Sequence, residues 1–543
     1  MDTLSPPHLE ALPVPTLFDR AAARFAERPA LSFEGRCWTY AQLAATIDRA
    51  TAGLQELGLQ RGDKIGLCLP NTPYFVIFYY AALKAGLVVV NYNPLYVARE
   101  LRHQIDDSGT TTMVVPDLAA IYDKVVDIET LGRIIVCPFA DILPTLKGIA
   151  FSLLRRSMLA SPAYSDRVLP YSRFNVAGAT PTPVPLDPSD LAVLQYTGGT
   201  TGRPKGAMLT HANLSINAQQ TTNHMPSMRL GQEKMVGVLP FFHVFAMTSI
   251  MNGGLSMGAE IILHPRFEID AIMTSLTRDK PTMLHAVPTI YAAIATAAEK
   301  HRVDISSLRV CVSGGAPLPA EIRERFQKLT GCRIIEGYGL TEAAPAVTSN
   351  PPDGQVRADS VGIAVQGTII EIRSLDDINR IMPPGERGEI CVRGPQVMRG
   401  YLNREQETHD AFIDGALRTG DVGYLDADGY LFITDRIKDL IICSGYNVYP
   451  RVIEDALYEH PAVAEAIVLG VPDPYRGQAP MAFVTLRAGE TRTGDELRDF
   501  LRDKLSPIEL PVHVEIRTTL PKTVVGKLSR KELVEEAIAL SST

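Results

Sequence analysis

One segment of eleven residues, Tyr196–Gly206, constrains the fold of this chain more than any other. It contains three threonines, four glycines, one arginine and one lysine. The apolar run 191–195 before it is typical of a buried strand, and residues 207–209 after it are again apolar. A strand that ends in a glycine- and threonine-rich loop can wrap its N–H groups around a polyphosphate, because glycine permits left-handed backbone and close approach. The segment lacks the Gly-Lys-Ser/Thr of a Walker loop, and by itself it is also consistent with a solvated hairpin turn.

Upstream of this loop the sequence predicts alternating helices and strands. Helical periodicity covers residues 16–25, 40–57 and 75–85, and apolar strand-like runs cover 64–69 and 88–90. Strands that alternate with helices at this spacing indicate an α/β fold with largely parallel sheets.

The length of 543 residues exceeds what one hydrophobic core usually supports, about 250–300 residues. Leu431–Ile433 is typical of a strand, and a short αβ pattern follows the polar segment after it. We therefore predict a domain at 1–434, a hinge at 435–439 and a small C-terminal domain at 440–543.

Composition narrows the class of protein. A formal net charge of −8 argues against nucleic acid as a partner. The seven cysteines are scattered without a CxxC pair, which fits a reducing compartment better than a disulfide framework or a zinc site. Neither a signal-peptide pattern nor an apolar run of about 18–20 residues is visible in the sequence. These features favour a soluble cytoplasmic enzyme.

Five more segments follow the loop in a fixed order. They are Ser313–Pro317, Glu336–Glu342, Thr419–Asp421, Asp435–Asp439 and Pro521–Arg530. With the loop, they resemble the motifs of the acyl-adenylate-forming superfamily, which includes acyl-CoA synthetases, adenylation domains of peptide synthetases and beetle luciferases. The resemblance covers essentially the whole chain, and it is greatest to bacterial medium- and long-chain fatty acid–CoA ligases.

The resemblance implies a fold and a movement. The fold is a large N-terminal domain of αβ-sandwich subdomains with a small β-barrel-like subdomain, followed by a small, mobile α+β C-terminal domain. The C-terminal domain is expected to swing about Lys438 between two catalytic configurations.

The implied chemistry is the activation of a carboxylate with ATP. A carboxylate is a poor acyl donor, and coupling it to AMP gives a mixed anhydride that a thiol can attack. Both steps build negative charge on phosphate or acyl oxygens, so the site needs cations and oriented donors.

The resemblance assigns the nucleotide site residue by residue. The expected ATP-binding residues are Thr197, Gly198, Gly199, Thr200, Thr201, Gly202, Lys205, Gly315, Ala316, Glu336, Gly337, Tyr338, Gly339, Thr341, Asp421, Ile433, Arg436 and Lys527. In this set the loop holds the β- and γ-phosphates, Tyr338 lies against adenine, and Asp421 and Arg436 bind the ribose. Glu342 and Thr197 are the expected Mg²⁺ ligands, since Mg²⁺ prefers hard oxygens. Taken singly, Tyr338 is also consistent with core packing and Asp421 with a turn.

The expected catalytic residues are Lys527, Glu342, Thr341 and His243. A lysine is a compact charge on a flexible stem, and Lys527 would bridge the attacking carboxylate and the α-phosphate during adenylation only. The basic residues around it also fit a solvated surface. In the second configuration Ser444, Gly445 and Tyr446 would meet coenzyme A (CoA), whereas the role of Asn447 is open because some relatives carry arginine or glutamine there.

The segment Val238–Phe245 matches the part of the family that lines the acid entrance. Phe241, His243 and Val244 are the expected acyl-binding residues, with His243 a gate or polariser; a buried core histidine is the alternative. Residues 238–250 contain no acidic side chain to bind an α-ammonium, which argues against amino acids as substrates.

The segment Ile142–Arg156 mixes apolar and basic residues at near-helical spacing. It fits a helix that contacts a membrane surface peripherally. It equally fits a helix docked on the protein, because Pro144 and Gly148 weaken a regular amphipathic pattern.

The resulting prediction is an ATP- and Mg²⁺-dependent ligase that joins a medium- to long-chain fatty acid to CoA. The alternatives are a CoA ligase for a dicarboxylic or aryl acid, a fatty acyl-AMP ligase that feeds a carrier protein, and a non-catalytic nucleotide-binding paralogue. Bacterial relatives imply a homodimer, although the sequence shows no interface pattern.

Overall fold

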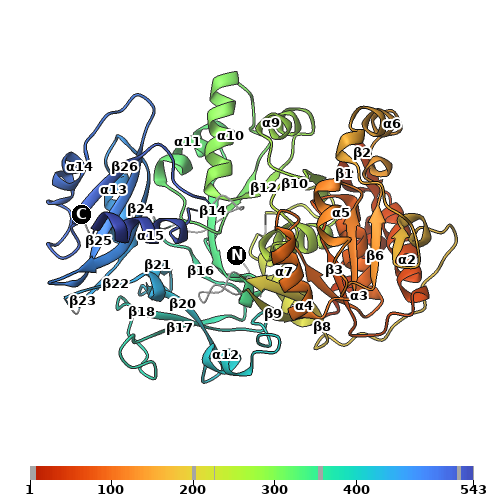
Figure 1. Cartoon of the computed structure of the whole chain (residues 1–543), viewed down its shortest axis with the longest axis horizontal. Helices are drawn as coiled ribbons and strands as arrows, with labels where there is room; N and C mark the ends of the chain where they lie inside the picture. The colour runs from red at the N-terminus through yellow and green to blue at the C-terminus, as the bar shows by residue number, and fades with distance from the viewer. Residues whose placement is uncertain are drawn as a thin grey trace, which may run out of the picture. The chain divides into compact units, whose positions relative to one another are not determined.

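The computed structural model describes residues 8–197, 204–225, 227–351, 357, 359–444, 446–522 and 528–541. The chain forms two compact units. Unit 1 is Met1–Val356, Gly362–Ile369 and Arg393–Phe412, and unit 2 is Arg357–Val361, Ile370–Val392 and Ile413–Thr543. Helices and sheets occur in both units (Figure 1), which confirms the predicted α/β class with a large N-terminal and a smaller C-terminal part.

The first sheet of unit 1 has seven strands in the order β7-β6-β5-β3-β4-β8-β9. They are β7 (Val168–Pro170), β6 (Arg133–Cys137), β5 (Thr112–Pro116), β3 (Lys64–Leu67), β4 (Val88–Asn91), β8 (Leu191–Thr197) and β9 (Lys205–Thr210). All neighbours are parallel except β8 and β9, which pair antiparallel and end at the pair Thr197–Lys205. The loop 198–203 therefore joins two adjacent strands, as expected from the sequence.

Helices predicted by periodicity cover this sheet. They are α2 (Tyr40–Glu56), α3 (Pro73–Lys84), α4 (Ala98–Ser108) and α5 (Ala119–Val125). Alternate strand residues such as Val88 and Val90 pack in one core with α4 and α5. Every described residue of α3 except Lys84 is buried, as is typical of a helix that is apolar all round.

The second sheet of unit 1 has nine strands in the order β16-β15-β14-β13-β12-β10-β11-β1-β2. They are β16 (Ile363–Ala364), β15 (Ala346–Ser349), β14 (Ile334–Gly339), β13 (Val310–Ser313), β12 (Met283–Ala286), β10 (Lys234–Gly237), β11 (Glu260–Leu263), β1 (Pro29–Phe33) and β2 (Arg36–Thr39). The six strands from β14 to β1 in this order are parallel neighbours, so their carboxyl ends share one edge.

The helices of this part include α1 (Val14–Arg24), α7 (His211–Asn223), α9 (Ile269–Arg278), α10 (Pro288–His301) and α11 (Ala320–Thr330). Thr210 starts α7 directly after β9, because its hydroxyl accepts a hydrogen bond from the Asn213 N–H while Asn213 returns one to Thr210. A π-helix, η4 (Ala246–Asn252), and the short α8 (Gly253–Ser256) follow β10 and are buried almost throughout.

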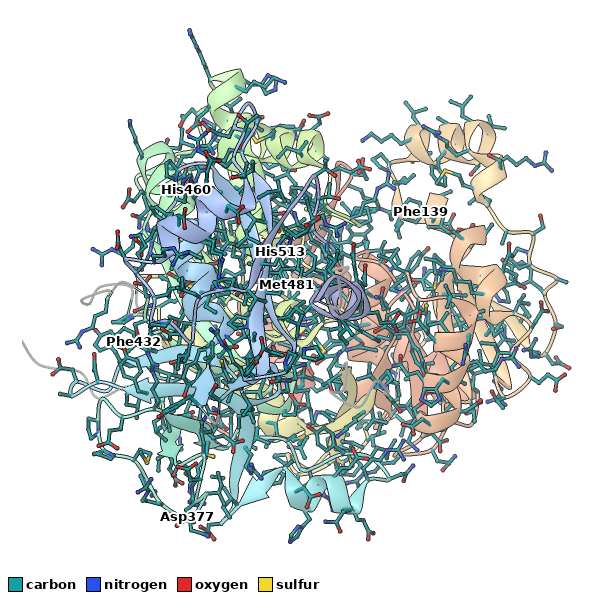
Figure 2. The ribbon with its side chains drawn as sticks, turned by 60° about the vertical axis from the view of Figure 1, so that its left-hand side comes forward. Phe139, Asp377, Phe432, His460, Met481 and His513 are labelled. Atoms are coloured by element: carbon teal, nitrogen blue, oxygen red, sulfur yellow. The ribbon has the colours of Figure 1, made fainter. Side chains whose placement is uncertain are left out.

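Unit 2 contains two further five-stranded sheets. The first holds β17 (Ile369–Arg373), β18 (Gly388–Arg393), β19 (Phe412–Ile413), β20 (Ala416–Leu425) and β21 (Leu431–Arg436), where β20 pairs antiparallel with β18 and β21. The second holds β22 (Ile441–Cys443), β23 (Tyr446–Val448), β24 (Val463–Asp473), β25 (Gly477–Leu486) and β26 (His513–Arg517). Met481 and His513, labelled in Figure 2, are opposite each other on β25 and β26.

The helices of the second sheet are α13 (Pro450–Tyr458), α14 (Gly494–Leu501) and α15 (Val534–Ser541). The segment 435–439 lies inside unit 2, where a short 3-10 helix, η6 (Ile437–Asp439), joins β21 to β22. The predicted division at 435–439 and the hinge at Lys438 thus stay predictions, since the chain's contacts group 413–434 with the residues after them.

Candidate active site

The sequence motifs of unit 1 follow the carboxyl ends of its parallel strands. The phosphate loop follows β8, residues 238–245 follow β10, Gly314–Pro317 follow β13, and Leu340–Glu342 follow β14. In open α/β sheets, ligands bind outside the carboxyl ends of the strands. The topology therefore brings these four motifs to the ends of strands where such sites form.

Buried amides tie the acyl segment to the neighbouring strands. Gln195, on β8 just before the phosphate loop, donates from Nε2 to the Phe242 carbonyl at 2.8 Å and accepts from Asn91 at 2.9 Å. Asn71 donates to the carbonyls of Gly237 and Leu239, and it accepts from the Phe241 N–H at 2.7 Å. Residues 237–242 are thus fixed against two strands of the first sheet.

The acyl segment also contacts the segment expected to bind adenine. A Cβ added at Gly314 would lie 3.3 Å from two atoms of the Phe245 ring, so a larger residue there would press on that ring. His243 is half-buried, and its Nδ1 accepts a hydrogen bond from the Phe245 N–H at 3.3 Å. An accepting Nδ1 places the proton of a neutral imidazole on Nε2.

The other two expected acyl-binding residues lie deeper. Phe241 is fully buried and packs edge-on against Phe75 of α3 at 5.8 Å between ring centroids. Val244 is likewise buried. Both side chains therefore contribute to the wall of this region from the core side.

Several buried polar atoms near these strand ends have no hydrogen-bond partner among the described residues. They include Nε2 of His285 on β12, Oγ of Ser313 at the end of β13, and Oγ1 of Thr248 in η4. Burial lowers the pKa of His285 to about 4, so its ring is neutral. Buried polar groups are normally paired, which makes these three atoms suited to a polar ligand or an ordered water.

A chain of charged contacts joins the phosphate-loop lysine to the expected Mg²⁺ ligand. The hydroxyl of Tyr401 donates to Oε1 of Glu342 at 2.8 Å. The ammonium of Lys205 lies 5.1 Å from the centroid of the same Tyr401 ring and pairs with Glu407. Burial and the Glu342 carboxylate together raise the pKa of Tyr401, so the phenol remains a hydrogen-bond donor.

Backbone pairing holds Tyr401 in this position. The N–H of Met208 donates to Gly400 O at 2.9 Å, and the N–H of Leu402 donates to Gly206 O at 2.9 Å. The N–H of Met398 donates to Glu342 O at 2.7 Å. Residues 398–402 therefore run along β9 and bridge it to the turn that carries Glu342.

The contacts extend toward the start of the phosphate loop. Arg404 pairs with Glu407 at 3.7 Å and with Asp107 at 3.1 Å, and Asp107 accepts from the Tyr196 hydroxyl at 2.7 Å. Tyr196 directly precedes Thr197, the last residue of β8. The two strands that flank the loop are thus braced by one polar network.

The expected adenine-binding residues occupy β13, β14 and the turns after them. Gly315 is exposed and Ala316 half-buried, whereas the carboxylate of Glu336 pairs with Arg323 at 3.3 Å and accepts from the Leu318 N–H at 3.3 Å. Glu336 therefore holds the turn around Gly315.

On β14, Gly337 and Gly339 flank Tyr338, which is half-buried. A Cβ at Gly339 would lie 2.1 Å from the Pro345 carbonyl oxygen, so the tight return to β15 excludes any side chain there. Thr341 and Glu342 follow in a 3-10 turn, η5 (Thr341–Ala343), and are half-buried.

Unit 2 contains the other expected ribose and CoA contacts. Asp421 and Arg436 are opposite each other on β20 and β21, and their side chains pair at 3.0 Å. Ile433 lies on β21 opposite Gly423. Ser444 and Tyr446, both exposed, flank the turn between β22 and β23, and Lys438 is exposed on η6. The remaining expected residues, Gly198, Gly199, Thr200, Thr201, Gly202, Gly445 and Lys527, lie outside the described residues.

A preformed metal cage is absent from the described part of the chain, since no group of three or more His, Cys, Asp or Glu side chains could hold an ion there. This fits Mg²⁺ that arrives with a nucleotide, because Mg²⁺ is usually bound by one or two carboxylates together with substrate phosphates. Glu342, with only Oε1 accepting from Tyr401, is a suitable carboxylate.

Comparison with known proteins identifies the family. Residues 18–402 match the AMP-binding enzyme family, and residues 452–527 match the AMP-binding enzyme C-terminal domain. The chain therefore belongs to the AMP-binding enzyme family, the acyl-adenylate-forming group that its motifs resemble.

Individual relatives cover nearly the full length. A long-chain-fatty-acid–CoA ligase of Bacillus subtilis (strain 168) is 40% identical over 542 residues, which are 98% of this chain and 96% of the relative. One of Escherichia coli O6:H1 is 38% identical, covering 96% and 94%. The solved structure of the anthranilate CoA ligase AuaEII in complex with anthranoyl-AMP matches with a TM-score of 0.84 and 25% identity, covering 98% of each chain.

Proposed function

We propose that this protein is an ATP-dependent ligase that joins a medium- to long-chain fatty acid to CoA through an acyl-adenylate, releasing AMP and pyrophosphate. The observation that carries the proposal is the 40% identity to the fatty acid–CoA ligase of Bacillus subtilis over 98% of the chain. The absence of acidic residues at 238–250 in the sequence supports an apolar acid over an amino acid.

In the first step a carboxylate oxygen of the acid attacks the α-phosphorus of ATP, and the bond to pyrophosphate breaks. Lys205 and the loop 198–202 would hold the departing phosphates, and Thr341 the α-phosphate. Lys527 would offset the charge that builds between the acid and the α-phosphate. Asp421, Ile433 and Arg436 are proposed to hold the nucleoside.

Mg²⁺ would be held by Glu342 and Thr197 together with the phosphates, and it would neutralise charge on the leaving pyrophosphate. The chain's own contribution is to aim Glu342, whose Oε1 accepts from Tyr401. Tyr401 in turn lies beside Lys205, so the same ring positions both a carboxylate and a cation.

In the second step the CoA sulfur attacks the acyl carbon, the thiol gives up its proton, and AMP leaves with the bridging oxygen. We propose that the C-terminal domain turns about Lys438 between the steps and brings Ser444, Gly445 and Tyr446 to the pantetheine arm. Membership of the AMP-binding enzyme family, with its separate C-terminal domain at 452–527, supports this two-step scheme.

A second candidate acid is aromatic. The match to the anthranilate CoA ligase, at a TM-score of 0.84, favours an aryl acid as the next class to test. Dicarboxylic acids, transfer to a carrier protein instead of CoA, and a homodimeric state remain open.

The test is the release of AMP and pyrophosphate from ATP and Mg²⁺ across acids from acetate to oleate, with a benzoate and a dicarboxylate, each with and without CoA. The proposal predicts CoA-dependent AMP release that is greatest with medium or long chains. A maximum on the benzoate or the dicarboxylate would replace the substrate class. Pyrophosphate release that is indifferent to CoA would indicate a carrier-linked enzyme, and no release with any acid a binding-only protein.

A further inference from the structure

One helix of unit 1 presents large apolar side chains to solvent. In α6 (Thr145–Leu154), Leu146, Leu153 and Leu154 are 83%, 73% and 81% exposed. Ile149 on the same helix and Met158 on the 3-10 turn that follows, η2 (Arg156–Met158), are also exposed. Single exposed leucines are ordinary, whereas a cluster on one short segment marks an interaction surface.

These side chains share one face of the helix. At about 100° per residue, Leu146, Ile149, Ala150, Leu153 and Leu154 fall within an arc of about 140°. We call this arc together with Met158 the α6 surface. It is apolar throughout and exposed at every one of these positions.

The opposite face fixes the helix to the protein. Gly148 is buried, and a Cβ there would lie 2.6 Å from the Ala140 carbonyl oxygen. Phe151 packs against Phe139, which is labelled in Figure 2, with ring centroids 5.2 Å apart. Lys147 donates to the Glu34 carbonyl at 2.8 Å, beside β1 and β2 at the edge of unit 1 (Figure 1). The helix is therefore held rigidly with its apolar face outward.

The charge around this face has one sign. Residues 142–165 contain Lys147, Arg155 and Arg156 and no acidic residue, in a chain whose formal net charge is −8. Arg155 and Arg156 are exposed at the carboxyl end of α6, next to Leu153 and Leu154. An apolar face bordered by cations is the composition of helices that lie in the boundary between lipid headgroups and acyl chains.

We propose that the α6 surface docks this protein on an anionic lipid bilayer, with the leucines inserted among the acyl chains and Arg155 and Arg156 against the headgroups. Charge complementarity selects this occupant over a second copy of the chain. Two copies that met through this surface would bring their cations together without an acidic partner from the same segment, whereas anionic headgroups neutralise them.

The test measures binding of the full-length protein to vesicles of phosphatidylcholine alone and of phosphatidylcholine mixed with phosphatidylglycerol, by co-sedimentation. Three proteins are compared with the wild type: Leu146→Ser/Leu153→Ser/Leu154→Ser, the charge variant Arg155→Glu/Arg156→Glu, and a matched control, Leu95→Ser/Val176→Ser/Leu230→Ser. The control also removes three exposed apolar side chains of unit 1, but none lies on α6. Thermal melts establish that each variant folds, since every altered side chain is exposed.

The wild type and the control should bind the anionic vesicles. The triple leucine variant should bind on the order of 50-fold more weakly, taking half of a leucine's transfer free energy at each position. The charge variant should lose about 30-fold on anionic vesicles and little on phosphatidylcholine. A wild type that binds neither vesicle, or a folded triple leucine variant that binds as well as the wild type, overturns the proposal. A dimer that only the triple leucine variant loses, without vesicle binding by any protein, assigns the surface to self-association instead. Because binding is measured without ATP or an acid, the result is independent of the proposed activity.

Discussion

Tyr401→Phe tests whether the contact chain from Lys205 to Glu342 positions the site for adenylation. The substitution removes only the hydroxyl that donates to Glu342 Oε1 at 2.8 Å. The ring stays, and with it the contact to the Lys205 ammonium at 5.1 Å. Glu342 would keep its charge and lose one fixed orientation.

The magnitude follows from the kind of hydrogen bond that is lost. A hydrogen bond to a charged group contributes about 1.5–3 kcal/mol. If that orientation matters in the transition state of adenylation, kcat/KM for pyrophosphate release should fall by about 10- to 100-fold. The Mg²⁺ concentration needed for half-maximal rate should rise as well, whereas thioester formation from preformed acyl-AMP should be nearly unchanged.

The assay is pyrophosphate release under varied ATP, Mg²⁺ and palmitate. Tyr74→Phe is the matched control, since it removes a buried hydroxyl that donates to the Pro138 carbonyl at 2.9 Å, away from Glu342. A folded Tyr401→Phe protein with wild-type kcat/KM and wild-type Mg²⁺ dependence would refute the positioning role. Equal losses in Tyr401→Phe and Tyr74→Phe would assign the effect to stability alone.

Three further predictions concern other parts of the chain. Lys527→Ala should abolish adenylation and largely spare thioester formation from preformed acyl-AMP; equal loss of both half-reactions, measured separately, would contradict the two-configuration scheme. Gly339→Ala should destabilise the protein by about 1–3 kcal/mol in thermal or denaturant unfolding, because its Cβ would lie 2.1 Å from the Pro345 oxygen, whereas Gly132→Ala, whose nearest contact would be 3.6 Å, should be tolerated. Burial raises the pKa of Asp435 from its ordinary 3.8 to about 6, so the folded state loses stability as the pH rises from about 4 to about 6, by up to about 3 kcal/mol. Asp435→Asn should remove that slope in denaturant unfolding, and parallel pH profiles for the two proteins would contradict the assignment.

The parts of the fold that the sequence predicted are those with local periodicity or local turn chemistry. The apolar run at 191–195 became β8, and the helical pattern at 40–57 became α2, which a capping box at Thr39 and Gln42 begins. The loop after β8 could be placed because a change from apolar to glycine-rich residues marks a strand end.

The supporting residues of the site were missed because their partners are distant in sequence. Tyr401 and Glu342 are far apart along the chain, and no local pattern links them. Gln195 and Asn71 did carry a signal, since each is a polar residue at the end of an apolar strand run and each is buried in the structure. A buried amide of this kind must find hydrogen-bond partners, and here both fix the acyl segment.

For the segment 142–156 the sequence left two interpretations open, and the structure shows why. Periodicity indicates that a helix has an apolar face but not which neighbour covers it. In α6 the docking residues are Gly148 and Phe151, and the larger apolar arc remains exposed. The helix is docked on the protein and still presents an apolar face to solvent.

The most direct test of the account follows oxygen through the reaction. Palmitate labelled with ¹⁸O in its carboxylate is incubated with the protein, ATP, Mg²⁺ and CoA, and the nucleotide products are analysed by mass spectrometry. The acyl-adenylate route predicts AMP that carries one ¹⁸O atom, because the attacking carboxylate oxygen leaves with the phosphate, together with palmitoyl-CoA and unlabelled pyrophosphate. Palmitoyl-CoA formed with unlabelled AMP, or with ADP and labelled inorganic phosphate, would contradict it.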